Sequence, residues 1–328
     1  MVNLIDFKKI LFRPSMDAQK LIQDLKSNIE KVIRGKEESI MLAITTLLAR
    51  GHLLIEDVPG LGKTTLAYSL AKSLGCSFKR IQFTSDLLPS DILGVTIYNP
   101  QRHDFEFRPG PIFANILLAD EINRTTPKTQ SSLLEAMNDA QVSVDNKTYS
   151  LPRPFMVIAT QNPMEYQGTY PLPESQLDRF MLRIRMGYPS IADEKRILAS
   201  QRIESLADGL QPVLSAHDVL ALQEKVTNVK VDESITDYLL AIVKSTRTSE
   251  LLDLGVSTRG GIFLYRVAQA LAFVEGRDYC LPDDIKRLVI PVFAHRVVVN
   301  SRLEVLGSEQ SNAEGILTEL LEGIPVPL

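Results

Sequence analysis

Residues 52–67 read HLLIEDVPGLGKTTLA, an apolar run that enters a glycine-rich loop and ends in Gly-Lys-Thr. The apolar run is typical of a buried strand, and the residues after the loop favour a helix. A loop of this kind turns backbone N–H groups, together with the positive end of the helix, toward phosphate groups. Lys63 would neutralise the β and γ phosphates, and the hydroxyl of Thr64 would bind Mg²⁺. The stretch therefore predicts a nucleoside triphosphate site.

One position departs from the common spacing G-x-x-x-x-G-K-[ST], because Asp57 stands where that spacing has glycine. A glycine-rich turn with a chance Gly-Lys-Thr is therefore the alternative on the loop alone. We assign nucleotide binding to the residues of the loop and the start of its helix: Pro59, Gly60, Leu61, Gly62, Lys63, Thr64 and Thr65.

A second stretch, NILLADEINR at residues 115–124, is an apolar run that ends in two adjacent carboxylates. It predicts a strand buried on both faces of a parallel sheet, with the carboxylates facing the ligand crevice. For phosphoryl transfer to water, Asp120 suits the Mg²⁺ shell and Glu121 suits polarisation of the attacking water. A lone acidic pair is also a common polar end of a strand, but the combination with the Gly-Lys-Thr loop favours the catalytic interpretation.

A third apolar strand is expected in PFMVIATQNP at residues 154–163, next to the strand before the loop. Asn162 at its end is able to bind the γ phosphate or the attacking water. An Asn before Pro is equally ordinary turn chemistry, so both interpretations stay open.

Length and composition predict a two-domain enzyme of the cytoplasm. The chain has 328 residues, which is longer than one hydrophobic core usually organises. Of these residues 45% are hydrophobic, which is enough for two cores. The apolar residues occur in short runs, and the N-terminus lacks the pattern of a secretory signal, so we expect no membrane insertion. Cys76 and Cys280 have no paired spacing, which disfavours a disulfide framework or a zinc site. The four histidines, His52, His103, His217 and His295, are equally scattered and are assigned to no site.

The net charge is −4, and basic and acidic residues are intermixed along the chain without a long basic block. Nucleic acid is therefore an unlikely partner, although a local basic strip could form in a ring assembly.

Further helices are expected at residues 18–31, 38–49 and 65–74, a strand at 79–84, and a brief helix within 86–94. Two hairpins are indicated at residues 96–113 and 141–152. The aromatic residues Phe105 and Phe107 of the first hairpin either touch a partner or pack the hairpin onto the sheet. After residue 189 helical spacing dominates, which predicts domains at residues 1–188 and 189–328.

Four motifs together resemble the MoxR-type members of the AAA+ ATPase superfamily, and the resemblance spans nearly the whole chain. The motifs are EDVPGLGKT at residues 56–64, ADEINRTTPKTQSSLLEAM at 119–137, ATQNP at 159–163 and LPESQLDRF at 172–180. The resemblance implies an α/β fold, a P-loop AAA+ core with a parallel sheet and hairpin insertions, followed by an all-α lid domain. Asp57 resembles a variant that this family tolerates.

Residue roles are implied position by position. Asp120 would bind Mg²⁺, Glu121 would act on the water, and Asn162 would sense the γ phosphate. Arg179 matches the arginine finger, a guanidinium delivered across a subunit boundary. Arg259, in STR at residues 257–259, matches the second sensor.

Alternatives stay open for several of these residues. Arg124, Arg183 and Arg185 are close enough in sequence to compete as the finger, and Arg179 could instead form a structural ion pair. Arg259 could be an ordinary surface residue at a helix start.

The segment around Val32 and Ile33 resembles the stretch that contacts the base.

The resemblance implies a homo-oligomeric, hexameric ring that uses ATP and Mg²⁺ to remodel or mature protein complexes. A protein client and a partner with a von Willebrand factor A domain are implied by the same resemblance. The rivals are a chelatase-like metal-insertion ATPase subunit, a nucleic-acid motor, and a non-catalytic switch in which nucleotide only stabilises a scaffold.

Overall fold

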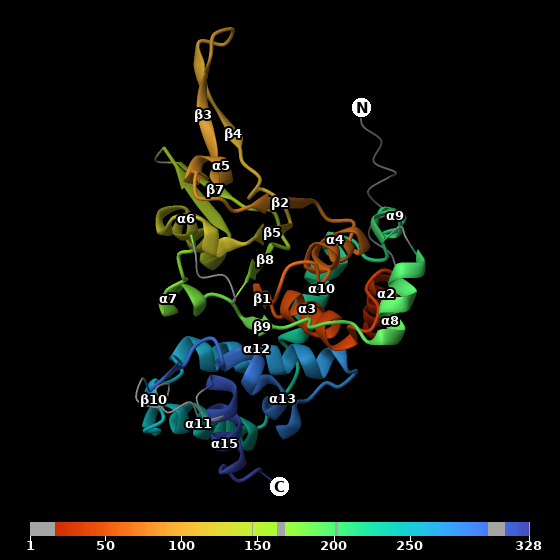
Figure 1. Cartoon of the computed structure of the whole chain (residues 1–328), viewed down its shortest axis with the longest axis vertical. Helices are drawn as coiled ribbons and strands as arrows, with labels where there is room; N and C mark the ends of the chain where they lie inside the picture. The colour runs from red at the N-terminus through yellow and green to blue at the C-terminus, as the bar shows by residue number, and fades with distance from the viewer. Residues whose placement is uncertain (1–16, 146, 163–167, 201–202, 301–311, 328) are drawn as a thin grey trace.

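The computed structural model describes residues 17–145, 147–162, 168–200, 203–300 and 312–327. Its centre is a five-stranded parallel sheet with the strand order β2-β5-β8-β1-β9 (Figure 1). The strands are β1 (Leu53–Glu56), β2 (Phe78–Gln82), β5 (Ile116–Asp120), β8 (Met156–Gln161) and β9 (Leu182–Ile184). The first four strands were expected from the sequence, and the expected position of β8 beside β1 is confirmed. No sequence pattern indicated β9.

Alternate residues of the strands enter two different hydrophobic clusters. Leu53 and Ile55 face the cluster that contains α2 (Ala18–Glu30), α3 (Glu37–Leu48) and α4 (Lys63–Ser73), whereas Leu54 faces the other. The second cluster lies under α5 (Pro89–Leu93) and α6 (Pro127–Asp139). Because both faces of the sheet are covered at its centre, β1, β5 and β8 have nearly continuous apolar sequences, whereas the edge strand β2 alternates with polar residues. The carboxyl ends of the strands are left free for polar residues.

Two antiparallel hairpins extend from this core. The first, β3 (Gly94–Asn99) with β4 (Asp104–Pro109), projects away from the sheet (Figure 1). Phe105 is 68% exposed near its tip, whereas Phe107 stacks on Tyr149 at a ring distance of 4.2 Å. The second hairpin, β6 (Gln141–Val144) with β7 (Lys147–Ser150), supplies Tyr149. Phe107 thus packs the first hairpin onto the second, whereas the ring of Phe105 contacts Tyr98 of its own hairpin at 5.5 Å. Asn146 of the expected turn lies outside the described residues.

The C-terminal part is mainly helical. Its elements are α8 (Ile191–Ser200), α9 (Ile203–Asp208), α10 (Ala216–Val226), α11 (Glu233–Thr248), α12 (Thr258–Val274), α13 (Pro282–Phe293) and α15 (Ala313–Glu322). This part also contains a short antiparallel strand pair, β10 (Leu252–Leu254) with β11 (Val298–Val299). The lid packs on the core through α12 against α3 and α13 against β9 (Figure 1). The division at residue 188 stays a prediction. None of the helices in the described ranges has the length and apolar character of a membrane span.

His52, just before β1, is a buried structural histidine. Its Nε2 lies 2.9 Å from the carbonyl of Met137, and its Nδ1 accepts from the N–H of Val157 at 3.0 Å. Both contacts together require the neutral ring with the proton on Nε2. Burial lowers the pKa of His52 to about 4.

This pKa predicts a loss of stability in acid. Unfolding returns the pKa of His52 to about 6.5, so the unfolded chain takes up the proton first as the pH falls below that value. The wild type should therefore lose about 3 kcal/mol more than a His52→Gln variant between pH 6.5 and 4, measured by urea unfolding. A His217→Gln variant at an exposed position is the control and should follow the wild type. Equal pH profiles for all three proteins would contradict the prediction.

Candidate active site

The glycine-rich loop connects β1 to α4 at the carboxyl edge of the sheet. Gly60 and Gly62 have φ angles of 85° and 86°, a region that residues with a Cβ adopt only under strain. Gly62 is the N-cap of α4, and Lys63 is the first residue of that helix. The unpaired N–H groups of the first turn therefore face the loop, as an anion site requires.

Asp57 forms structural hydrogen bonds that explain why this position of the loop is not glycine. Its Oδ2 accepts from the N–H groups of Met186 and Gly187 at 2.6 and 2.8 Å. Its carbonyl accepts from Nζ of Lys63 at 2.7 Å. Asp57 thus ties the loop to the segment that leaves β9 toward the lid.

Lys63 is 8% exposed and lies in an acidic environment. Burial lowers its pKa, and the neighbouring carboxylates of Asp120, Asp57 and Glu121 oppose this effect. The lysine predicted for phosphate binding and the two predicted catalytic carboxylates are therefore brought together at the carboxyl ends of β1 and β5, the two parallel strands that flank β8.

Asp120 ends β5 and is held by two residues that sequence reasoning missed. Thr160, from β8, donates its hydroxyl to Oδ1 at 2.6 Å. Arg80, from β2, donates Nε to Oδ2 at 3.1 Å and also binds it through Nη2. Both strands are direct neighbours of β5. The polar alternation of residues 79–82 was the available signal for Arg80.

Glu121 follows with a left-handed backbone, φ 56° and ψ 50°. For a residue that is not glycine this conformation is strained, and such strain is frequent at functional positions. Its side chain accepts from Gln82 at 2.7 Å and pairs with Arg124 at 3.0 Å. Its N–H donates to the hydroxyl of Thr160 at 2.8 Å. Thr160 thus holds both members of the acidic pair.

Asn162 and Ile33 lie at the same edge as the loop. Asn162 follows β8, directly after Gln161, whose carbonyl accepts from the N–H of Asp57 at 3.1 Å. Ile33 is buried and is the side chain nearest to a Cβ built on Gly62, at 3.9 Å. Val32 is buried beside Ala207 and Leu210. The γ-phosphate sensor and the base contact stay predictions.

The donor set fits a magnesium nucleotide. Mg²⁺ prefers carboxylate and hydroxyl oxygens and keeps several waters, and Asp120 and Thr64 offer those oxygens beside the loop. A magnesium nucleotide would bring an electrophilic phosphorus and a charged leaving group. The chain would hold the phosphates with Lys63 and the loop N–H groups, and Glu121 would orient and deprotonate a water.

Thr160 gives a direct test of the magnesium assignment. Residues that hold a ligand in place typically contribute 10- to 100-fold to metal affinity. A Thr160→Val variant should therefore need about 10- to 100-fold more Mg²⁺ for half-maximal ATP hydrolysis, and Thr160→Ser, which keeps the hydroxyl, should stay close to the wild type. An unchanged Mg²⁺ requirement in Thr160→Val would show that Asp120 needs no such support.

Arg179 lies at the opposite edge of the sheet. It precedes β9, which runs parallel to β1 with Leu182 opposite Leu53, whereas the loop follows the carboxyl end of β1. Its Nη1 donates to the carbonyl of Leu134 in α6, and its Nε is buried with no hydrogen-bond partner. Within the described ranges Arg179 forms no ion pair, so the structural ion pair considered from the sequence is not found there.

Arg259 lies near the same amino edge, at the start of α12. Its Nη1 is 3.7 Å from Oδ2 of Asp178, and its side chain is 49% exposed. The structure therefore places Arg259 next to the residue that precedes Arg179.

The other arginines considered for the finger have carboxylate partners in the same chain. Arg183 pairs with Glu56 at 2.9 Å and with Glu314. Arg185 pairs with Glu314 at 3.2 Å. These contacts join the core to α15.

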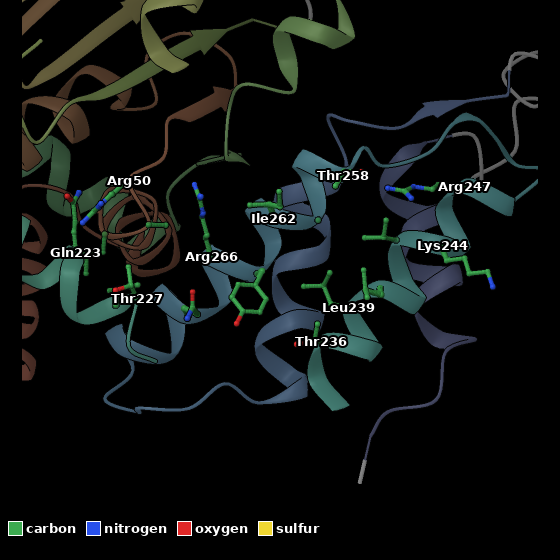
Figure 2. A pocket seen from close by; sticks show the side chains of 18 residues that line it. Arg50, Gln223, Thr227, Thr236, Leu239, Lys244, Arg247, Thr258, Ile262 and Arg266 are labelled. Atoms are coloured by element: carbon green, nitrogen blue, oxygen red, sulfur yellow. The ribbon is translucent and has the colours of Figure 1, made fainter. Parts of the chain in front are cut away.

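A large cavity of about 740 Å³ lies elsewhere, between the end of α3 and the helices α10, α11 and α12 (Figure 2). Its lining is apolar, with four cationic residues: Arg50, Lys244, Arg247 and Arg266. None of the loop residues lines it, and neither Asp120 nor Glu121 does, so it is separate from the glycine-rich loop.

Comparison with known proteins agrees with this geometry. Residues 52–182 match the ATPase family associated with various cellular activities (AAA), and residues 244–316 match the AAA lid domain. The chain is 49% identical to YeaC of Bacillus subtilis over 95% of its length and 97% of that protein. It is 39% identical to the chaperone MoxR1 of Mycobacterium tuberculosis over 91% of this chain and 80% of that one. A crystal structure from Cytophaga hutchinsonii, 38% identical, superposes with a TM-score of 0.88 over 95% of this chain and 96% of that one. The chain belongs to the MoxR family of AAA+ ATPases.

Proposed function

We propose that this protein hydrolyses ATP with Mg²⁺ in a homo-oligomeric, hexameric ring whose active sites are shared between subunits. One observation carries the proposal. The loop with Asp120 and Glu121 lies at the carboxyl edge of the sheet, and Arg179 lies at the amino edge. An arginine at the amino edge cannot serve the loop of its own subunit, but it is suited to the loop of a neighbour.

The chemistry follows from the residues at the shared site. Glu121 would accept a proton from the attacking water, while Lys63 and the loop N–H groups hold the phosphates. Arg179 of the neighbouring subunit would stabilise the charge that develops on the transferred phosphoryl group. Assembly would therefore switch on hydrolysis.

We further propose that the hydrolysis drives remodelling or maturation of protein complexes in the cytoplasm. Two facts support this step: the relative MoxR1 is named a chaperone, and the β3–β4 hairpin exposes the aromatic side chain of Phe105. A protein client, together with a partner carrying a von Willebrand factor A domain, is the proposed context.

The proposal is tested by measuring ATP hydrolysis per subunit against protein concentration, with light scattering on the same samples. We expect the rate per subunit to rise as the ring assembles and to show no dependence on added DNA. A rate independent of concentration in a protein that stays monomeric would mean that one subunit holds a complete site. Stimulation by DNA that weakens with salt would favour the nucleic-acid motor.

A further inference from the structure

Asp178 connects the segment that carries Arg179 to the lid through three side chains. Its Oδ1 accepts from Nε of Arg296 at 2.9 Å. Both of its carboxylate oxygens lie 3.2 Å from the hydroxyl of Ser257. The third side chain is Arg259, whose Nη1 lies 3.7 Å from Oδ2 of Asp178. Three lid residues thus converge on the side chain directly before the predicted finger.

Arg296, which follows α13, also binds Phe180, the residue after Arg179. Its guanidinium donates to the carbonyl of Phe180, and Nε2 of His295 lies 3.0 Å from the same carbonyl. The Arg296 side chain is 1% exposed. Burial lowers its pKa to about 10, and the carboxylate of Asp178 opposes that effect. A buried guanidinium needs such a partner, so Asp178 and Arg296 are held together.

The first turn of α12 is packed onto the same cluster. Ser257 is the N-cap of α12 and accepts from the N–H of Gly260 at 3.1 Å. A Cβ at Gly260 would lie 2.6 Å from Cγ1 of Val256 and 3.0 Å from Cδ of Arg296, so a larger residue would displace these side chains. Phe263, one turn further along α12, lies under the Arg296 guanidinium at 5.1 Å. Arg259 therefore lies beside the cluster that holds Asp178 and Phe180, the two residues on either side of Arg179.

We propose that Asp178 is a positioning residue, which links Arg179 and Arg259 so that both arginines are presented to the neighbouring subunit as one unit that follows the lid. This inference rests on the proposed function, because it assumes that Arg179 acts on a neighbour. A motion of the lid in one subunit would then change hydrolysis in the next subunit.

The test uses Asp178→Asn, which keeps a hydrogen-bond acceptor for Arg296 but removes the charge. We expect kcat for ATP to fall about 100-fold, the size of a small misplacement of a catalytic group, with unchanged ATP binding. Addition of excess Lys63→Ala protein should restore hydrolysis, because that variant brings an intact finger and lacks its own nucleotide site. Asp237→Asn, an exposed carboxylate on α11, is the charge-matched control and should keep the wild-type rate.

Two outcomes would overturn the inference: a wild-type kcat in Asp178→Asn, or a loss of kcat that Lys63→Ala does not restore. The second outcome would mean that Asp178 serves its own subunit or only its fold. If Asp178→Asn does not fold, Ser257→Ala carries the test, with a smaller loss that is restored in the same way. An Arg179→Ala and Lys63→Ala mixture run in parallel separates the two proposals. If activity returns in the Arg179→Ala mixture but not in the Asp178→Asn mixture, the proposal of a shared site stands and only the proposed role of Asp178 is rejected.

Discussion

An Arg179→Ala variant should retain ATP binding and lose about 10³- to 10⁵-fold in turnover, the range that arginine fingers contribute. The reason is that Arg179 lies at the amino edge of the sheet, far from the phosphates that its own loop would bind, so ATP affinity should not depend on it. The measurement is steady-state phosphate release together with binding of a fluorescent ATP analogue. Arg185→Ala is the matched control, because Arg185 is 56% exposed and pairs with Glu314 in its own chain.

Mixing experiments separate a shared site from a damaged one. Neither Arg179→Ala nor Lys63→Ala should turn over ATP alone. In mixed rings, hydrolysis per Arg179→Ala subunit should rise with the proportion of Lys63→Ala subunits, because more intact loops then face an intact finger. If the two variants co-assemble, as light scattering can establish, and no activity returns, then Arg179 does not act across subunits.

A Glu121→Gln variant should bind ATP normally and hydrolyse it about 10²- to 10⁴-fold more slowly, which is the usual contribution of a general base. The substitution keeps the size of the side chain and its ability to contact Gln82, but the amide cannot accept a proton from water. ATP should therefore remain bound and hold the protein in its assembled state, which light scattering with ATP present would record.

Glu135→Gln, at an exposed position on α6, makes the same chemical change outside the site and should leave the rate unaltered. Unchanged phosphate release in Glu121→Gln would instead support the reading in which nucleotide only stabilises a scaffold.

The parts of the site that lie within one strand, loop and helix could be predicted from the sequence. Apolar runs that end in Glu56, Asp120 and Gln161 define buried parallel strands, and the carboxyl ends of parallel strands meet at one edge. Lys63 and the acidic pair were therefore expected together, and the positive φ angles of Gly60 and Gly62 follow from the loop.

Contacts between distant segments could not be predicted in this way. Asp57 looked like an anomaly because its partner Met186 is 129 residues away, and nothing in the local pattern announces that pair. The same holds for Asp178 and Arg296, 118 residues apart. Strand β9 has only three residues, too few for a periodic signal to stand out. Side-chain hydrogen bonds between elements depend on the packed geometry, whereas strand and helix patterns depend on near neighbours.

The placement of the loop and of Arg179, the proposed finger, at opposite edges of the sheet has a consequence for symmetry. Two subunits related by a two-fold axis bring like surfaces together, whereas here unlike surfaces must meet. The proposed contact is therefore head-to-tail and heterologous, and it must close on itself or continue as an open helix. Each subunit would then have one neighbour that it activates and a different neighbour that activates it. A ring built in this way has a sense of rotation, so a change at one nucleotide would be passed around the ring in a single direction.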